Sequence, residues 1–196
     1  MIQLIKQLAG DAKIVFDVGA AEGSVTEGYL GMFPNAVVYA FEPTPGLCKL
    51  KSGRRVKVVK VAVAEKSGTA TLYLNRKPHT NSLLPFVKQG GALVTHNTVE
   101  VPAVSLDDFC REVGIEWVDV LKIDTQGTEL QVLVGATGLF NKGAVKVVVV
   151  ELQGASIYAG QCKRGDVGKF LSHYGFVLKY EQVASTRTHS DGVFAK

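Results

Sequence analysis

Cysteine is scarce in this chain and proline is uncommon, with 3 Cys and 6 Pro among 196 residues. Cys48, Cys110 and Cys162 lie far apart in the sequence, and none belongs to a CxxC pair or to a Cys/His pair at zinc spacing. We therefore expect neither a disulfide framework nor a structural zinc site. Unpaired thiols are typical of a reducing compartment, which predicts a cytoplasmic location.

Long hydrophobic runs are absent as well. The first residues carry Gln3, Lys6 and Gln7, where a secretory signal needs a continuous apolar core. The apolar residues of this segment recur at helical spacing instead, which predicts a short N-terminal helix within residues 1–13. The densest apolar run, residues 145–150, is far too short to cross a bilayer, so we expect no membrane span.

Neither sign of charge is in large excess, since 22 Lys and Arg stand against 18 Asp and Glu, a formal net charge of +4. That balance permits an anionic partner without requiring one. The hydrophobic content of 46% is too high for a disordered chain, and 196 residues are enough to bury one core. We expect a single domain over residues 1–196, while the composition leaves the oligomeric state open.

Short β-branched runs alternate with segments of helical period along the whole chain. This alternation predicts a doubly wound α/β sheet that is covered by helices on both faces. Residues 69–74 are expected to form a hairpin with the strand before them, through the turn at Ser67-Gly68. The predicted strands are residues 14–18, 36–41, 56–63, 69–74, 118–123, 145–150, 176–180 and 193–195, and the predicted helices lie within 25–33, 105–114, 130–134 and 167–174.

The segment 76–98 fits neither pattern. It has little periodicity and contains Pro78, His79, Pro85 and His96. A loop of that length inside a compact domain is usually functional or mobile. We expect it to cover the substrate as a lid.

Polar residues follow the predicted strands at the points where ligands bind in open α/β sheets. The first group is a glycine turn, in which Gly19 and Gly23 allow a ligand to approach the backbone at the start of a helix. Glu42 ends the next strand, 23 residues beyond Gly19, where an acid can accept hydrogen bonds from both hydroxyls of a ribose. The groups are residues 17–23, Glu42-Pro43, Asn81-Ser82, residues 124–127 and Glu151.

The glycine turn and Glu42 together predict a nucleoside-containing cofactor, and the spacing of the turn narrows the choice. A dinucleotide fingerprint has the pattern GxGxxG, whereas this turn has Gly19 and Gly23 with Glu22 between them. A carboxylate there would repel a pyrophosphate but suits the sulfonium and ammonium groups of S-adenosylmethionine. No GxxxxGK[ST] motif is present, so P-loop chemistry is excluded.

The sequence resembles the FkbM-type S-adenosylmethionine-dependent methyltransferases. The similarity covers roughly residues 14–180, nearly the whole chain, and its most specific part is the run that begins at Leu121. The matching stretches are Val15-Phe-Asp-Val-Gly-Ala, Ala40-Phe-Glu-Pro, Asn81-Ser-Leu, Ser105-Leu-Asp-Asp-Phe, Leu121-Lys-Ile-Asp-Thr-Gln-Gly-Thr-Glu-Leu-Gln-Val-Leu-Val-Gly-Ala and Val150-Glu-Leu.

The resemblance implies a Rossmann-like, mostly parallel sheet with an antiparallel last strand. It also implies methyl transfer to a hydroxyl of a small molecule, sugar or lipid, with Glu42 on the ribose and Asp124 beside the transferring methyl group. The expected cofactor-binding residues are Asp17, Gly19, Ala20, Glu22, Gly23, Glu42, Pro43, Asn81 and Ser82. Two positions depart from the family pattern, since Ala21 stands where Asn is usual and Gln126 where Glu is usual.

Methyl transfer to an alcohol needs a general base, and the candidates are Asp124, His79 and His96. Asp124 follows a buried strand, although it could instead cap the helix that follows. Each histidine could simply be a surface residue. Asp124 and Glu151 end adjacent strands and could together hold Mg²⁺, but with Gln126 in place of an acid we expect no metal site.

Two other functions remain open. Six basic residues within 49–60 could bind nucleic acid, which would make the protein an RNA methyltransferase. Interleaved aromatic residues for base stacking are missing from that stretch, so we expect a solvated surface there instead. The change at Gln126 also leaves room for a catalytically inactive binding protein with a methyltransferase fold.

Overall fold

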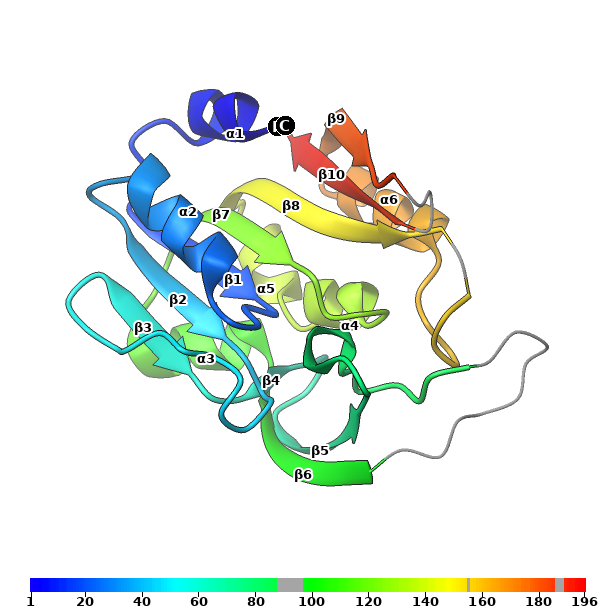
Figure 1. Ribbon diagram of the computed structural model, residues 1–196. Helices are drawn as coiled ribbons and strands as arrows, with labels where there is room; N and C mark the ends of the chain where they lie inside the picture. The colour runs from blue at the N-terminus through cyan, green and yellow to red at the C-terminus, as the bar shows by residue number, and fades with distance from the viewer. Residues whose placement is uncertain (88–96, 155, 186–188) are drawn as a thin grey trace.

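The computed structural model describes residues 1–87, 97–154, 156–185 and 189–196. Its helices and strands alternate along the chain much as the sequence predicts (Figure 1). The helices are α1 (Ile2–Ala9), α2 (Ser24–Met32), η1 (Pro78–Thr80), α3 (Leu106–Val113), α4 (Glu129–Val134), α5 (Thr137–Asn141) and α6 (Arg164–His173). The strands are β1 (Ile14–Val18), β2 (Val37–Phe41), β3 (Val56–Val59), β4 (Ala62–Val63), β5 (Gly68–Leu74), β6 (Asn97–Val104), β7 (Val118–Ile123), β8 (Val145–Gln153), β9 (Val177–Val183) and β10 (His189–Ala195).

Seven strands form the main sheet, in the order β3-β2-β1-β7-β8-β10-β9. The first five of these are parallel to one another, while β10 runs antiparallel to both β8 and β9. The chain winds outward from β1 to one edge and then from β7 to the other. This confirms the predicted doubly wound, mostly parallel sheet with an antiparallel last strand.

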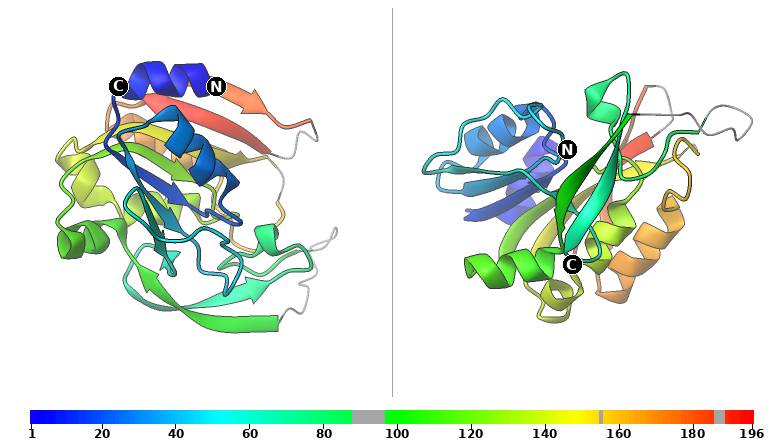
Figure 2. Two further views of the ribbon diagram at one scale, coloured as in Figure 1. Left: turned by 60° about the vertical axis from the view of Figure 1, so that its left-hand side comes forward. Right: turned by 90° about the horizontal axis from the view of Figure 1, so that it is seen from below.

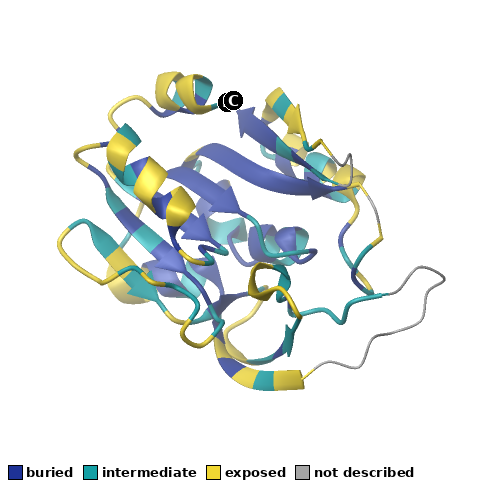
Figure 3. Ribbon diagram, in the orientation of Figure 1, coloured by how far each residue is buried: buried dark blue, intermediate teal, exposed yellow. Residues whose placement is uncertain are grey.

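Helices cover both faces of this sheet, because its central strands are apolar on both sides. All residues of β7 are buried (Figure 3). Ile5 of α1 and Tyr29 of α2 pack in one hydrophobic cluster, and Val132 of α4 and Leu171 of α6 pack in the other. The result is three layers, with α1 and α2 on one face and α3 to α6 on the opposite face (Figures 1 and 2).

A second, three-stranded sheet was not predicted from the sequence. The predicted strand 56–63 is wrong as a single element, since the chain divides into β3, in the main sheet, and β4, in the small one. The predicted hairpin of 69–74 with the preceding strand is also wrong, because β6 lies between β4 and β5. The small sheet lies beneath the main sheet in Figure 1.

The segment 76–98 has more local structure than predicted. It contains η1, Ser82 forms a β-bridge with Tyr73, and Phe86 forms one with Tyr158. Its last two residues, 97 and 98, already belong to β6. Residues 88–96, and with them His96, lie outside the described part of the chain, so the expected lid stays a prediction.

In the described ranges of the chain, we find no helix that is both long and apolar enough to cross a membrane.

Candidate active site

A cavity of about 940 Å³ opens at the carboxyl ends of β1, β2, β7 and β8. The small sheet and the segment around η1 form its opposite wall, through residues such as Leu72 and Phe86. The residues expected from the sequence that line it are Gly19, Glu42, Pro43, His79, Asn81, Ser82, Asp124 and Glu151. Asp17, Ala20, Glu22 and Gly23 are not among its lining residues.

The turn after β1 is tied to the ends of both neighbouring strands. The backbone N–H groups of Gly19 and Ala20 both donate to the carbonyl oxygen of Phe41, at 3.0 and 2.9 Å. On the other side, the N–H of Asp124 donates to the carbonyl oxygen of Val18 at 2.9 Å. Gly19 has a φ of 82°, and a Cβ there would lie 1.8 Å from the carbonyl oxygen of Asp124. Only glycine fits at this position.

Glu42 closes the turn from the β2 side. Its Oε2 accepts a hydrogen bond from the N–H of Ala21 at 2.9 Å, and its Oε1 accepts one from the N–H of Thr44 at 2.8 Å. Glu42 is buried, yet it lines the cavity. Each carboxylate oxygen can accept a second hydrogen bond. The carboxylate is therefore fixed in place and still able to accept two hydroxyl groups.

Ala21 adopts a left-handed conformation, with a φ of 47°. Asparagine and glycine tolerate this region better than alanine does, which explains why the Asn usual in the resembling family suits this position. The Glu42 hydrogen bond to the Ala21 N–H holds the strained residue. The turn thus keeps its shape without the asparagine.

Asp17 is fully buried beneath the turn. Its Oδ2 accepts a hydrogen bond from Thr26 Oγ1 at 2.6 Å, and its Oδ1 lies 3.2 Å from Lys122 Nζ. Lys122 Nζ also donates to the carbonyl oxygen of Gly19 at 3.2 Å and lies 3.5 Å from Asp124 Oδ2. Burial alone would lower the pKa of Lys122, but Asp17 and Asp124 outweigh it and raise the pKa. Asp17 and the ammonium group of Lys122 thus hold the turn from below.

The other predicted residues of the turn do not line the cavity. Glu22 is exposed and forms an ion pair with Lys49 at 3.0 Å. Gly23, with a φ of 104°, caps α2 and packs against the side chain of Leu50. Ala20 is buried. A direct cofactor contact by these side chains stays a prediction.

Gln126 joins two carboxylates at the base of the cavity. Its Nε2 donates to Asp124 Oδ1 at 2.7 Å and to Glu151 Oε2 at 3.0 Å. Its Oε1 accepts a hydrogen bond from the Tyr158 hydroxyl at 2.9 Å. Both polar atoms of the amide group are therefore paired, and the amide links Asp124 to Glu151.

The two carboxyl groups differ in their surroundings. Burial raises the pKa of Glu151 to about 9, with Asp124, Glu129 and Asp191 adding to the effect. Asp124 is about one-third exposed and faces the ammonium group of Lys122. We infer that Glu151 is neutral at pH 7.

Asp124 does not act as the cap of the helix that follows it. The turn between β7 and α4 is held by Glu129, whose Oε1 accepts hydrogen bonds from the N–H groups of Thr125 and Gly127 at 3.0 and 2.9 Å. The side chain of Asp124 contacts Gln126 and Lys122 instead. Its carboxylate is thus left facing the cavity.

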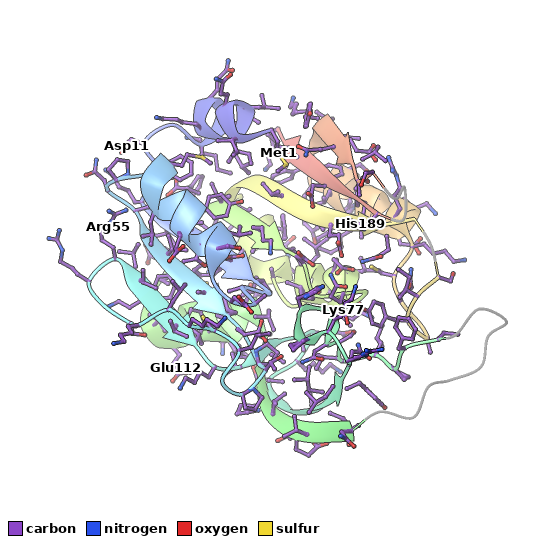
Figure 4. The ribbon with its side chains drawn as sticks, in the orientation of Figure 1. Met1, Asp11, Arg55, Lys77, Glu112 and His189 are labelled. Atoms are coloured by element: carbon purple, nitrogen blue, oxygen red, sulfur yellow. The ribbon has the colours of Figure 1, made fainter. Side chains whose placement is uncertain are left out.

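Among the residues that the structure describes, His79 and His189 line the cavity, and the sequence predicted only the first of them. His79 lies on η1 and is exposed. His189 begins β10, and its Nε2 lies 3.8 Å from Glu151 Oε1. Figure 4 labels His189 and also Lys77, the residue that caps the helix of His79. The two histidines thus reach the cavity from separate segments of the chain. His189 was missed because it begins a strand that enters the sheet in the opposite direction.

No arrangement of three or more His, Cys, Asp or Glu side chains that could hold a metal ion occurs within the described ranges. Asp124 and Glu151, the pair considered from the sequence, both accept hydrogen bonds from the Gln126 amide. The N–H groups of that amide occupy the space between the two carboxyl groups.

The basic stretch 49–60 lies away from the cavity. Arg55 donates to the carbonyl oxygens of Leu30 at 2.6 Å and Phe33 at 3.2 Å, at the C-terminal end of α2. In Figure 4, Arg55 lies on the opposite side of the molecule from His189. β3 forms one edge of the main sheet. Part of the stretch is therefore engaged within the fold.

Comparison with known proteins gives a consistent result. Residues 17–178 match the family described as "Methyltransferase FkbM domain". The chain is 24% identical to the 2-O-methyltransferase NoeI of Sinorhizobium fredii (strain NBRC 101917 / NGR234), over 91% of this chain and 79% of that protein.

Solved structures share the fold at low sequence identity. The precorrin-6y C5,15-methyltransferase of Geobacter metallireducens GS-15 has a TM-score of 0.53 at 15% identity, over 100% of this chain and 85% of that one. The magnesium protoporphyrin IX methyltransferase (ChlM) of Synechocystis PCC 6803, solved with bound SAM, has a TM-score of 0.51 at 13% identity, over 98% of this chain and 77% of that one.

Proposed function

Because the chain belongs to the FkbM methyltransferase family, we propose that it transfers the methyl group of S-adenosylmethionine to a hydroxyl oxygen of a small molecule, sugar or lipid. The observation that carries the proposal is that Glu42 and Asp124 line one cavity, on either side of the glycine turn at Gly19. Glu42 is suited to a ribose, and Asp124 is suited to a hydroxyl proton.

The chain's own residues would hold the cofactor through the turn and Glu42. The Glu42 carboxylate, fixed by the N–H groups of Ala21 and Thr44, accepts hydrogen bonds from both ribose hydroxyls. Pro43, Asn81 and Ser82 line the same cavity and are assigned to the cofactor site with it. When bound, S-adenosylmethionine supplies an electrophilic methyl group on a positively charged sulfur.

Asp124 is the proposed general base. The acceptor oxygen forms a bond to the methyl carbon as the carbon–sulfur bond breaks, and S-adenosylhomocysteine leaves with the electron pair. The proton of the acceptor hydroxyl passes to the side chain of Asp124. Gln126 and Lys122 fix that carboxylate from two sides, which limits the geometries in which the acceptor can lie.

His79 is assigned a supporting role at the cavity mouth, where it could take the proton from an acceptor that lies farther out. Asp124 is preferred because its carboxylate is fixed by two partners, whereas His79 is exposed on a short helix. The relative named as a 2-O-methyltransferase supports oxygen as the methylated atom, although the acceptor itself is not carried over from it.

The test is a two-part experiment on the purified chain. Calorimetry with S-adenosylhomocysteine measures cofactor binding. Transfer of labelled methyl from S-adenosylmethionine to a panel of sugars, lipids, small alcohols and RNA measures activity. We expect binding and label on a hydroxyl acceptor. Label on RNA would favour the nucleic-acid alternative, binding without transfer would favour an inactive binding protein, and no binding would refute the proposal.

A further inference from the structure

Gln153 is a buried amide that the proposed reaction does not use. It is the last residue of β8, two positions after Glu151, so both side chains project from the same face of the sheet. It is 7% exposed and lines the cavity. In the antiparallel register it lies opposite His189, which lines the cavity too. Gln153 therefore belongs to the end of the cavity near β8 and β10.

The orientation of the Gln153 amide is set by Glu151. Its Nε2 donates to Glu151 Oε2, the same oxygen that accepts from Gln126 Nε2. The amide nitrogen is thus held against the carboxyl group, while the carbonyl oxygen takes no part in this contact. Asp124, Gln126, Glu151 and Gln153 form one hydrogen-bonded row along the cavity.

The two amides of this row differ at their carbonyl oxygens. Gln126 Oε1 accepts a hydrogen bond from the Tyr158 hydroxyl. Gln153 Oε1 is buried and has no hydrogen-bond partner among the described residues. A buried carbonyl oxygen without a donor is unfavourable, and most such atoms in proteins are paired. A ligand that brings an O–H group to this oxygen removes that cost.

We propose that Gln153 determines acceptor specificity, by accepting a hydrogen bond from a second hydroxyl on the same acceptor molecule. The inference rests on the proposed function. The reacting hydroxyl would lie at Asp124 and the second at the far end of the row, so the acceptor class is a diol or polyol such as a sugar ring or a cyclic diol. An acceptor with one hydroxyl leaves Gln153 Oε1 unpaired.

The experiment measures binding of simple alcohols to the chain saturated with S-adenosylhomocysteine. The probes are cyclohexanol and three diols, namely cis- and trans-1,2-cyclohexanediol and cis-1,3-cyclohexanediol. Ligand-observed NMR titrations give the dissociation constants. We expect at least one diol to bind about tenfold more tightly than cyclohexanol, because only a diol pairs the Gln153 carbonyl.

Gln153→Met removes the amide while keeping the length of the side chain. We expect this variant to lose most of the preference for the diol, with its affinity for S-adenosylhomocysteine unchanged. Gln182→Met, at an exposed position on β9, is the matched control and should keep the preference. The comparison of diol with monool in the unmodified chain needs no variant, so it can still overturn the inference if Gln153→Met does not fold.

Each remaining outcome has a defined meaning. Suppose that S-adenosylhomocysteine binds. If the diols then bind no more tightly than cyclohexanol, or if no probe binds measurably, the inference about Gln153 is overturned and the proposed function stands. A diol preference that survives in Gln153→Met overturns it as well. Loss of S-adenosylhomocysteine affinity in that variant would assign Gln153 to the cofactor site instead. Failure of the unmodified chain to bind S-adenosylhomocysteine refutes the proposed function and this inference together.

Discussion

Gly19 and Asp124 lie so close that a Cβ atom on Gly19 would fall 1.8 Å from the carbonyl oxygen of Asp124. This contact joins the turn that is proposed to hold the cofactor to the strand end that carries the proposed base. A shift of either backbone segment therefore changes the position of the other. The proposed cofactor site and the proposed base are therefore coupled through the contact between Gly19 and Asp124.

Gly19→Ala should damage the site and the fold together. A Cβ at this position meets backbone atoms, which cannot rotate away, and the φ of 82° is unfavourable for alanine. We expect the free energy of unfolding to fall by about 1–3 kcal/mol and the affinity for S-adenosylhomocysteine to fall at least about tenfold. Thermal unfolding and calorimetry measure the two effects.

The control for Gly19→Ala is Gly28→Ala in α2, where a Cβ would meet no atom within 4 Å. Alanine favours a helix more than glycine does, so this variant should be as stable as the unmodified chain or slightly more so. If Gly19→Ala bound S-adenosylhomocysteine as tightly as Gly28→Ala does, the close contact between Gly19 and Asp124 would not be needed for cofactor binding.

Glu42→Ala should weaken cofactor binding. The change removes a charge-assisted contact to the ribose, which is expected to lower the affinity for S-adenosylhomocysteine more than about tenfold. It also leaves the N–H groups of Ala21 and Thr44 without their carboxylate partner, so a lower melting temperature is expected. Glu27→Ala, at an exposed position on α2, is the control. If calorimetry finds that Glu42→Ala binds S-adenosylhomocysteine as tightly as the control does, Glu42 does not bind the ribose.

Asp124→Asn should slow turnover much more than it weakens cofactor binding. The substitution keeps the shape of the side chain and removes the group that takes the proton, a loss that typically costs about 10²–10⁴ in rate. The backbone hydrogen bond from Asp124 to Val18 does not depend on the side chain, so the fold should persist. Labelled-methyl transfer and calorimetry separate the two effects, with Asp166→Asn, at a half-exposed position on α6, as the control. Unchanged turnover would exclude Asp124 as the base.

Glu151→Gln should stabilise the protein, and more so at higher pH. The pKa of Glu151 is raised from an ordinary 4.5 to about 9, so between these values the unfolded chain has lost a proton that the folded chain retains. Folding stability from this group therefore falls as pH rises, by at most about 1.4 kcal/mol per pH unit. A glutamine, which does not ionise, is free of this loss.

Melting temperatures of the two proteins should accordingly agree near pH 4.5 and diverge towards pH 8, where Glu151→Gln should melt several degrees higher. The glutamine carbonyl can accept the hydrogen bonds from Gln126 and Gln153 as the carboxyl group does. A melting-temperature difference that does not change with pH would mean that Glu151 has an ordinary pKa in the folded protein.

The sequence predicted the main sheet because its signals are local. The run Val118–Ile123 is apolar enough for a strand covered on both faces, and the polar residues that follow each strand marked the cavity edge. The small sheet was missed because one β-branched run, 56–63, serves two sheets. Val99, Val101 and Ala103 alternate as a strand should, but Pro102 interrupts the signal, and pairing with β4 begins only at Ala103.

The cavity lining was predictable where a residue reaches the cavity from its own strand end, as with Glu42 and Asp124. It was not predictable where residues distant in sequence meet. Tyr158 reaches Gln126 from the segment after β8, and His189 arrives on an antiparallel strand. Lys122 lay within a recognised motif, yet its burial between Asp17 and Asp124 depends on the packing of β7 against β1.

Gln126 is one nucleotide substitution away from a glutamate. Glutamine codons differ from glutamate codons only in their first base, so one nucleotide substitution would convert Gln126 to the glutamate usual in the family. That change would bring a third carboxyl group to Asp124 and Glu151, where the amide now donates to both. Such a cluster must share protons or recruit a cation. A single point mutation therefore separates this amide-linked pair of carboxyl groups from a cluster of three acids, with the scaffold around them unchanged.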